Sequence, residues 1–365
     1  MIKKLEINHL KSIKNIQIEC SDINLLIGTN SSGKSTVIQG MLFAAQNIEQ
    51  ACGLNGGLIS LGSFEENRCI YARDKVIEVV IEDENNHQAS VMLSQGMEDA
   101  PVLKMGFKQP EDQEILRWNF DYRKRKLQYL SCHRVGPLNV YKKNMTMEDT
   151  IGIDGEYAIA FLNKHGPDVL EPDLCRYDLD YTLLGQVNWW LSYIAETEVS
   201  TEEIWGADLI KASYTMYGVN KIRPINIGSG ISYLISILIV CLSSPSGAVI
   251  AIENPEIHLH PSAQAKLCEF FYFIFSGSRQ LFIESHSDHI FNGFRAGIAA
   301  GEMDQEKINI QFISLNEEHM SQAMPVQIGR MGRIENQRKD LFDQFDLDLN
   351  KMIGLRGKRN GVNPK

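Results

Sequence analysis

Alternating apolar and polar residues mark the first part of the chain as β-strands followed by a helix. Lys3–Ile7 and Ile13–Ile18 alternate with a period of two, and Ile23–Ile27 is a continuous apolar run typical of a buried strand. From Thr36 the apolar residues follow the spacing of a helix packed on a sheet, and we expect this helix to end near Gln50. The pattern therefore predicts a strand, a short loop and a helix in direct succession.

Further β-like stretches lie between residues 68 and 130. They are Val76–Ile81, Ala89–Leu93 and Lys126–Leu130, and polar turns such as Glu82–Asn86 separate them. We expect these stretches to form an antiparallel β-lobe at the edge of the main sheet.

The pattern changes at residue 136. Glu156–Leu162 and Thr182–Ile194 have helical spacing, and no sustained heptad repeat predicts a coiled coil. From residue 224 the chain alternates again between helices (Ile231–Leu242, Ser262–Phe273, His289–Ala299) and strands (Ala248–Ile252, Gln280–Ile283, Ile308–Leu315). We therefore predict an α/β fold in four parts: an N-terminal part with the β-lobe (1–135), a mainly helical inserted lobe (136–223), a C-terminal part (224–330) and a tail (331–365).

Composition narrows the classes of function. Of the 365 residues, 44% are hydrophobic and 22% are charged, as in ordinary globular proteins. The net charge of −10 argues against a surface coated with nucleic-acid-binding charge, although a local basic groove stays open. The seven cysteines contain no C-x-x-C pair, which favours reduced thiols in the cytoplasm over disulfides or a zinc site. The longest apolar run, Ile231–Leu242, is too short to cross a bilayer, so we expect no membrane partner.

The loop between the third strand and the first helix carries the clearest chemistry. Gly28–Ser35 reads G-x-x-x-x-G-K-S, the pattern of a phosphate-binding loop. Its glycines let several backbone N–H groups point at one spot, and the helix that follows adds its positive dipole end. Lys34 would reach the β- and γ-phosphates, and Ser35 would bind Mg²⁺. The residues that we expect to bind the nucleotide are Asn30, Ser31, Gly33, Lys34, Ser35 and Thr36.

Acidic residues follow the apolar strand Ala248–Ile252 in the order E-N-P-E. In enzymes with a phosphate-binding loop, a carboxylate at such a strand end binds Mg²⁺ and the next acid orients the attacking water. We therefore assign Glu253 to the metal site. Asn254 cannot act as a base, and Glu256 is the candidate to replace it.

Two other turns are candidate phosphate contacts. Ser285–His289 follows the strand Gln280–Ile283, and His286 there could contact a γ-phosphate; the alternative is a histidine that caps the next helix. Ser229 and Gly230 open another helix, where small residues favour an anion site, with an ordinary N-cap as the alternative.

Two remaining motifs favour structural roles. His258 and His260 lack further ligands at zinc spacing, so we expect them to serve structure or an interface. The basic run Arg123–Lys126 is more typical of a solvated strand end than of a nucleic-acid site.

Together these segments resemble a known family. The order G-T-N-S-S-G-K-S-T, G-S-G-I-S, I-E-N-P-E-I-H-L-H-P and E-S-H-S-D-H is similar to that of the ABC-type ATPases of the SMC/RecF/OLD group. Within the group the chain resembles the short ATPases without a coiled coil that occur in bacterial anti-phage defence. The resemblance extends to Leu5–Ile13, Tyr129–Pro137 and Gly152–Tyr157, and so covers most of the chain.

The resemblance implies a P-loop NTPase fold of ABC type, with ATP and Mg²⁺ as cofactors. Lys34 and Ser35 become the Walker A pair, Glu253 takes the place of the Walker B aspartate, and His286 becomes the switch histidine. Ser229 and Gly230 become the signature-like turn, which in the family binds the γ-phosphate held by the opposite subunit. A homodimer with sites completed in trans is therefore expected. Gln46 and Gln50 are candidates for the glutamine-bearing loop, whose position stays open.

The function that we expect is an ATP-dependent dimeric switch, slowly hydrolysing, that controls a separate effector such as a toxin or nuclease. Asn254 in the place of the general base keeps open a non-hydrolysing ATP-dependent scaffold or sensor. A DNA-maintenance ATPase of the RecF type, a transporter subunit and a small-molecule kinase are further alternatives. The residues after His286 lack the spaced acidic cluster of a nuclease, so we expect any nucleolytic activity to belong to a partner.

Overall fold

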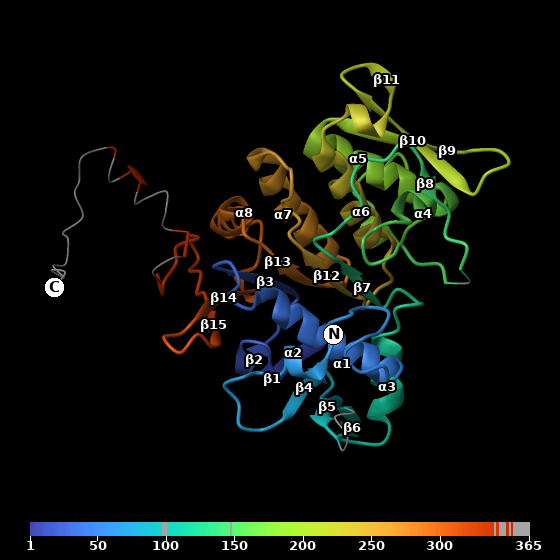
Figure 1. Cartoon of the computed structure of the whole chain (residues 1–365). Coiled ribbons are helices and arrows are strands. Elements are labelled where there is room, and N and C mark those ends of the chain that lie inside the picture. Colours follow the sequence, from blue (N-terminus) through green and yellow to red (C-terminus); the bar gives the residue numbers. More distant parts are fainter. Residues whose placement is uncertain (97–100, 147, 339–340, 343–347, 350–351, 353–365) are drawn as a thin grey trace, which may run out of the picture.

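The part of the chain that the structure describes is organised around three β-sheets, and one of them carries the phosphate-binding loop. The computed structural model describes the chain except for residues 97–100, 147, 339–340, 343–347, 350–351 and 353–365. Figure 1 shows the strands of the loop-bearing sheet at mid-height, with the antiparallel N-terminal sheet below and residues 136–223 above. Most of the predicted tail beyond Leu341 thus lies outside the described residues.

The central sheet has six strands in the order β15-β14-β3-β13-β12-β7. The strands from β14 to β7 are parallel, and β15 is an antiparallel edge strand. Their bounds are β3 Ile23–Gly28, β7 Leu127–Leu130, β12 Val249–Glu253, β13 Gln280–Glu284, β14 Ile308–Leu315 and β15 Ser321–Pro325. Every residue of β7, β12 and β13 is buried, as expected for parallel strands covered on both faces. Because β3, β12 and β13 run in one direction, their carboxyl ends meet at one edge of the sheet.

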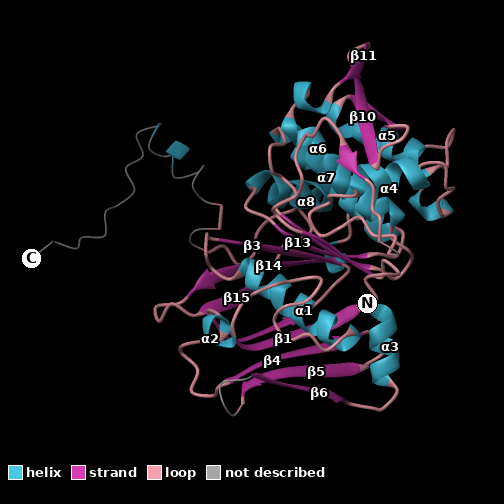
Figure 2. Cartoon of the chain, turned by 45° about the vertical axis from the view of Figure 1, so that its right-hand side comes forward, coloured by secondary structure: helices cyan, strands magenta, loops and turns pink. Residues whose placement is uncertain are grey.

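The two faces of this sheet pack into two separate cores. Ile23, Leu25 and Ile27 of β3 pack with the helical layer, whereas Leu26 packs on the opposite side with helix α1 (Lys34–Glu49). Helices α6 (Ser229–Ser243), α7 (Pro261–Ser276) and α8 (Asp288–Ala300) contribute to the first core. Figure 2 shows the sheet between these helices above and α1 with the antiparallel sheet below. The alternation of side chains along each strand therefore holds a three-layer fold together.

The N-terminal strands form the second sheet, in the order β2-β1-β4-β5-β6. Its members are all antiparallel: β1 Ile2–Leu10, β2 Ile13–Glu19, β4 Val76–Asp83, β5 Gln88–Gln95 and β6 Pro101–Phe107. Buried and more exposed residues alternate along β4 and β5, which confirms the predicted β-lobe. The short helices α2 (Phe64–Asn67) and α3 (Asp112–Asn119) lie in the connections around this lobe.

One strand was assigned to the wrong sheet by the sequence pattern. Residues 127–130 form β7, which pairs in parallel with β12 of the central sheet and not with the antiparallel lobe. Local alternation predicts that a strand exists, but its partner is set by contacts with residues far away in the sequence.

The inserted segment contains helices and strands, so the expectation of a mainly helical lobe is only partly correct. Its helices are α4 Ala158–His165 and α5 Leu183–Ala195, with the short 3₁₀ turn η2 Pro172–Leu174, and a second 3₁₀ turn, η3 Pro224–Asn226, follows the segment. A third sheet joins β8 Tyr141–Lys142, β9 Thr197–Glu203, β10 Leu209–Met216 and β11 Val219–Ile222. The proposed boundaries at residues 136 and 223 stay predictions.

A buried arginine connects the insertion to the central sheet. Arg279, 1% exposed, lies just before β13 and pairs with Glu171 (2.7 Å) and Asp173 (3.3 Å) beside η2. Its guanidinium also donates to the carbonyl of Ser244 at the end of α6. The start of β13 is thereby fixed to the insertion. Another 3₁₀ turn, η4 Gln305–Lys307, leads into β14.

Candidate functional site

Close backbone packing explains the glycines of the phosphate-binding loop. Gly28 ends β3 with a φ of 146°, and a Cβ there would lie 1.9 Å from the carbonyl oxygen of Ile313 on β14. Gly33 has a φ of 104° and precedes α1, and a Cβ there would lie 2.4 Å from the Ser321 hydroxyl. Only glycine fits these two positions, so the neighbouring strands β14 and β15 fix the loop on the sheet.

Lys34 is held inside the loop. Its Nζ donates to the carbonyls of Thr29 (2.8 Å) and Gly28 (3.1 Å). Burial lowers the pKa of the Lys34 ammonium, and the carboxylates of Glu284 and Glu256 act in the opposite direction. A cation is therefore placed at the loop with two carboxylates near it, where phosphates would compete for its donors.

The two acids at the strand ends lie side by side. Glu253 ends β12 and Glu284 ends β13, and they are register partners in the parallel ladder. The Ser35 hydroxyl donates to Oε1 of Glu284 at 2.8 Å. Burial raises the pKa of Glu284 to about 7, with the Glu253 carboxylate adding to the rise and Ser35 and Lys34 opposing it. Glu284 was not among the predicted site residues, although it directly follows an apolar strand, which is the signal that identified Glu253.

Glu253 contacts a different part of the sheet edge. Its Oε1 accepts from the Tyr129 hydroxyl (3.1 Å), and its Oε2 accepts from the backbone N–H of Cys132 (3.1 Å). The carboxylate of the predicted metal residue is thus bound to β7 and the turn after it.

The residue after Glu253 has an unusual backbone. Asn254 has a φ of 46°, in the left-handed region that non-glycine residues rarely occupy. The buried Arg134 guanidinium donates to the carbonyls of Glu253 (2.5 Å), Asn254 (2.6 Å) and Ser131 (2.8 Å). Arg134 therefore holds the turn in which the general base of the family would lie.

Glu256 joins the two acidic strand ends. Its Oε1 accepts from the backbone N–H of His286 (2.7 Å), and its Oε2 accepts from the Ser285 hydroxyl (2.9 Å). Partial desolvation and the Lys34 charge lower the pKa of the exposed His286, which favours the neutral imidazole. The structure thus brings Lys34, Ser35, Glu253, Glu256 and His286 to one edge of the sheet, with Glu284 among them.

Unpartnered polar atoms gather at the same edge. Buried side-chain atoms without a hydrogen bond in the described part of the chain include Glu284 Oε2, Asn254 Oδ1 and Arg134 Nε. Buried polar atoms without a partner are uncommon in folded proteins. Ser35 and Glu284 offer the hard oxygen donors that Mg²⁺ prefers, so the residues present fit the expected cation.

The remaining loop residues differ in exposure. Asn30 and Ser31 are exposed, whereas Thr36 is buried on α1.

The signature-like turn belongs to helix α6, a different element from the helix that follows the phosphate-binding loop. Ser229 and Gly230 begin α6, and a Cβ on Gly230 would lie 2.4 Å from the carbonyl oxygen of His258. His258 stacks on Tyr233 with a ring separation of 5.4 Å. Among the described residues, no hydrogen bond joins Ser229 or Gly230 to the phosphate-binding loop. Their predicted role in a second subunit's site stays a prediction.

Several other candidate residues serve local structure. Gln46 bonds to the backbone of Gly53 and Ile59, and Gln50 follows the last residue of α1, so neither contacts the phosphate-binding loop in the described part of the chain. His260 caps α7 through the backbone N–H of Ser262. The seven cysteines are all described and all unpaired.

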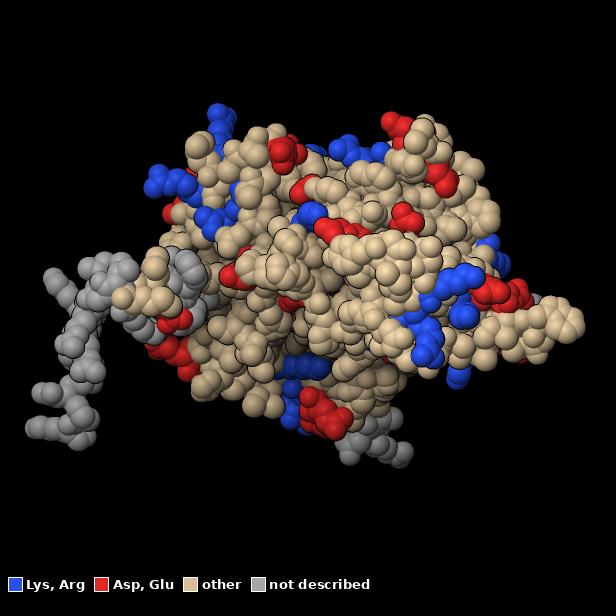
Figure 3. All heavy atoms as spheres, turned by 90° about the horizontal axis from the view of Figure 1, so that it is seen from above, with Lys and Arg blue, Asp and Glu red and all other residues tan. Residues whose placement is uncertain are grey.

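The basic run Arg123–Lys126 makes contacts within the chain. Arg123 pairs with Glu148, Lys124 pairs with Asp121, and Lys126 donates to the Ser246 carbonyl. Figure 3, which views the insertion side, shows Lys and Arg interspersed with Asp and Glu on that face. Neither feature favours a nucleic-acid surface. No helix in the described residues is long and apolar enough to cross a bilayer.

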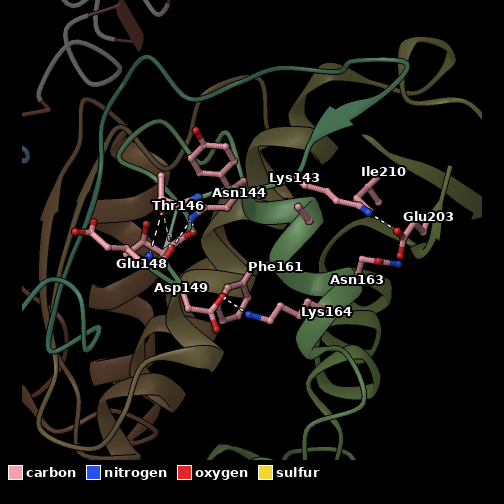
Figure 4. Close-up of a pocket in the computed structure, with 13 residues that line it drawn as sticks. Lys143, Asn144, Thr146, Glu148, Asp149, Phe161, Asn163, Lys164, Glu203 and Ile210 are labelled. Atoms are coloured by element: carbon pink, nitrogen blue, oxygen red, sulfur yellow. Dashed lines mark hydrogen bonds and ion pairs between the residues drawn. The ribbon is translucent and has the colours of Figure 1, made fainter. Parts of the chain in front are cut away.

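A separate cavity of about 390 Å³ lies in the insertion (Figure 4). Four of its charged side chains pair with one another, Lys143 with Glu203 and Lys164 with Asp149 at 3.0 Å, and the fifth, Glu148, pairs with Arg123. Because these charges are already neutralised by ion pairs, the cavity is a weaker candidate for binding a charged ligand than the edge of the central sheet.

Comparison with known proteins agrees with the motifs. A family model described as "AAA ATPase domain" matches residues 1–130 and 192–291, more than half of the chain. No curated protein matched in the sequence comparison.

Solved structures with a similar fold include two SMC heads. An SMC head bound to the C-winged helix domain of ScpA is 13% identical, with a TM-score of 0.55, covering 90% of this chain and 98% of that one. An SMC head domain with an extended coiled coil, bound to the C-terminal domain of ScpA derived from Pyrococcus furiosus, is 14% identical, with a TM-score of 0.53, covering 98% and 99%. At these identities the likeness concerns the fold alone, and it confirms the predicted α/β fold of ABC-ATPase type.

Proposed function

The chain belongs to the AAA ATPase domain family, and on that premise we propose that it is an ATP-binding, slowly hydrolysing switch. In this proposal two copies of the chain enclose two ATP molecules and control a separate effector subunit. A toxin or nuclease that acts in bacterial anti-phage defence is the effector class we propose. The two similar SMC heads are each bound to a ScpA domain, which supports a partner subunit here as well.

One observation carries the nucleotide site. Lys34 lies inside the loop, and Ser35 contacts a buried carboxylate at the tip of β13. When bound, Mg²⁺ would neutralise phosphate charge. The chain itself would supply the remaining contacts: backbone N–H groups and Lys34 would bind phosphate oxygens, and Ser35 with an acid at a strand end would hold the cation.

ATP affinity tests the site directly. We expect Lys34→Ala to weaken ATP binding by about a hundredfold or more, because it removes the cation at the phosphates. Lys14→Ala is the matched control, since Lys14 is an exposed lysine on β2 and its loss changes the net charge equally. Calorimetric titration of both variants with ATP gives the comparison, and normal affinity in Lys34→Ala would contradict the proposal.

Hydrolysis separates the switch from a second candidate, a non-hydrolysing ATP-dependent scaffold. Asn254 favours the scaffold because its amide cannot accept a proton from water. Glu256 favours hydrolysis because it is a carboxylate that already contacts the His286 turn. Phosphate release by the wild-type protein that disappears in Glu256→Gln would exclude the scaffold. No release from the wild-type protein, with ATP bound, would support it.

The trans arrangement is tested by mixing two inactive variants. Lys34→Ala removes the loop function and Ser229→Arg blocks the signature-like turn. If each site takes one half from each copy, mixed dimers regain one complete site and ATP turnover returns. Turnover that stays absent in the mixture, with dimers present by light scattering, would contradict sites completed in trans.

A further inference from the structure

We propose that Glu284, and not Glu253, provides the carboxylate oxygen that binds the Mg²⁺ of the nucleotide beside Ser35. The proposal rests on the proposed ATP-binding function. It places the metal site between α1 and the tip of β13, whereas the family pattern places it at the tip of β12.

The position of Glu284 is fixed by the strand that carries the loop. β13 lies between β3 and β12, and Glu284 is the register partner of Leu26 on β3. The next residue, Ser285, donates its backbone N–H to the Leu26 carbonyl at 3.0 Å. The carboxylate therefore lies directly beside the phosphate-binding loop, and its Oε1 is 2.8 Å from the Ser35 hydroxyl.

The three acids at this edge differ in which oxygens are free. Glu253 has both oxygens hydrogen-bonded, to Tyr129 and to the Cys132 backbone. Glu256 also has both occupied, by Ser285 and the His286 backbone. Glu284 has one oxygen bonded to Ser35 and one buried oxygen, Oε2, that has no hydrogen-bond partner among the residues that the structure describes.

An unpartnered buried carboxylate oxygen is costly, and a cation would satisfy it. Mg²⁺ is bound in nucleotide enzymes by one or two carboxylates together with phosphates and water, and it needs no larger protein cage. No group of three or more His, Cys, Asp or Glu in the described residues could hold a metal by itself. A hydroxyl, one carboxylate and the phosphates of ATP form the kind of donor set that Mg²⁺ takes.

The experiment compares ATP affinity with Mg²⁺ and with EDTA in the full chain. The ratio of the two dissociation constants reports metal binding and does not require hydrolysis. In Glu284→Gln we expect the increase in ATP affinity that Mg²⁺ produces to fall by about ten- to a hundredfold, while the ATP affinity in EDTA is retained. In Glu253→Gln, the same substitution one strand away, we expect most of the increase in ATP affinity with Mg²⁺ to remain. Glu78→Gln on β4 is the control, because this carboxylate lies in the antiparallel sheet and bonds to Ser90.

Mn²⁺ provides a second readout. The paramagnetic resonance signal of Mn²⁺ bound with ATP should be lost from Glu284→Gln at Mn²⁺ concentrations that saturate the wild-type protein. Ser35→Ala should weaken Mn²⁺ binding in the same direction, because Ser35 is the other protein donor of the proposed site. If Glu284→Gln is poorly folded by thermal melting, loss of Mn²⁺ binding in folded Glu253→Gln would by itself contradict the assignment.

Two failures are distinguishable. The metal assignment would be overturned, and ATP binding left intact, by one pair of results. Folded Glu284→Gln would keep the wild-type ratio of ATP dissociation constants in EDTA and Mg²⁺, and Glu253→Gln would lose it. A wild-type protein that binds ATP neither with Mg²⁺ nor with EDTA would overturn the proposed function and the metal site together.

Discussion

The Ser35 hydroxyl donates a hydrogen bond of 2.8 Å to Glu284, although the two residues are 249 positions apart in the sequence. The contact joins the first turn of α1 to the tip of β13. It places a serine that follows the loop lysine against a buried acid with a raised pKa. The stability of the protein and its response to pH should both depend on this pair.

Glu284→Gln should stabilise the protein above neutral pH when nucleotide and metal are absent. The pKa of Glu284 rises from 4.5 to about 7 in the folded state, so the folded protein holds this proton more tightly than the unfolded chain. The stabilisation that this proton provides is complete below pH 4.5, the pKa of Glu284 in the unfolded chain. It is lost as the pH rises through about 7, the pKa of Glu284 in the folded protein. At about pH 8 we expect the variant to exceed the wild-type protein by up to roughly 3 kcal/mol in the free energy of unfolding, and near pH 4 by little. Urea unfolding in EDTA measures both values.

Glu78→Gln gives the baseline for exchanging a carboxylate for an amide elsewhere in the fold. A Glu284→Gln variant that is less stable than the wild-type protein at high pH would show that the charged form is favoured by contacts other than those described.

Gly28→Ala should destabilise the fold strongly. The new Cβ would collide with the Ile313 carbonyl at 1.9 Å, and alanine rarely adopts a φ of 146°. We expect a cost of about 3 kcal/mol or more, measured by the urea midpoint. Gly57→Ala is the matched control because a Cβ there meets no atom within 4 Å and its φ is not positive. Equal effects in the two variants would contradict the close approach of β14.

Arg134→Met should destabilise the turn after β12. The substitution leaves three backbone carbonyls without their donor, including those of Glu253 and Asn254. Buried acceptors that lose their partner cost roughly 1 to 3 kcal/mol each, and we expect a total of about 3 kcal/mol after relaxation. Arg134→Lys keeps the charge and should recover part of the loss. The exposed Arg73 provides a control: Arg73→Met should be close to neutral in the same unfolding assay.

Arg279→Met should loosen the insertion. Removing the guanidinium leaves the Ser244 carbonyl unpaired and breaks the contacts with Glu171 and Asp173. We expect a loss of about 3 to 5 kcal/mol and faster proteolysis within residues 166–182. Glu171→Gln removes one half-exposed partner and should cost less than about 1 kcal/mol. A larger loss in Glu171→Gln than in Arg279→Met would reverse this order and contradict the anchoring role of the buried arginine.

Local patterns predicted the strands and helices whose apolar residues follow a clear period or form a continuous run. Ile308–Leu315 is a strand with the predicted bounds, and the helix after Lys34 ends within one residue of Gln50. The short strands of the insertion, such as β9 with Glu198, Glu202 and Glu203, carry too many polar residues to give a clear apolar period. Their existence depends on pairing with β10, which a local pattern does not contain.

The residues of the candidate site divide in the same way, into those that a local motif contains and those that distant contacts bring together. Lys34 and Ser35 could be predicted because one continuous motif contains both of them with its glycines. Glu284 could not be assigned, because its role depends on which strand lies next to β3 and on the side chain that faces it across the layer. The strand order β14-β3-β13-β12, which places Glu284 next to the loop-bearing strand, is a property of the folded sheet and is not contained in any local sequence pattern.

The five-residue strand β13 has different partners at its two ends. Arg279, just before it, contacts the insertion, and Glu284, its last residue, contacts the loop that begins α1. A ligand bound at either end would therefore act on the same strand. If a partner bound to the insertion changes the affinity for ATP by some factor, thermodynamic reciprocity requires ATP to change the affinity for that partner by the same factor. Arg279→Met, which removes the contacts between the start of β13 and the insertion, should bring that factor towards one.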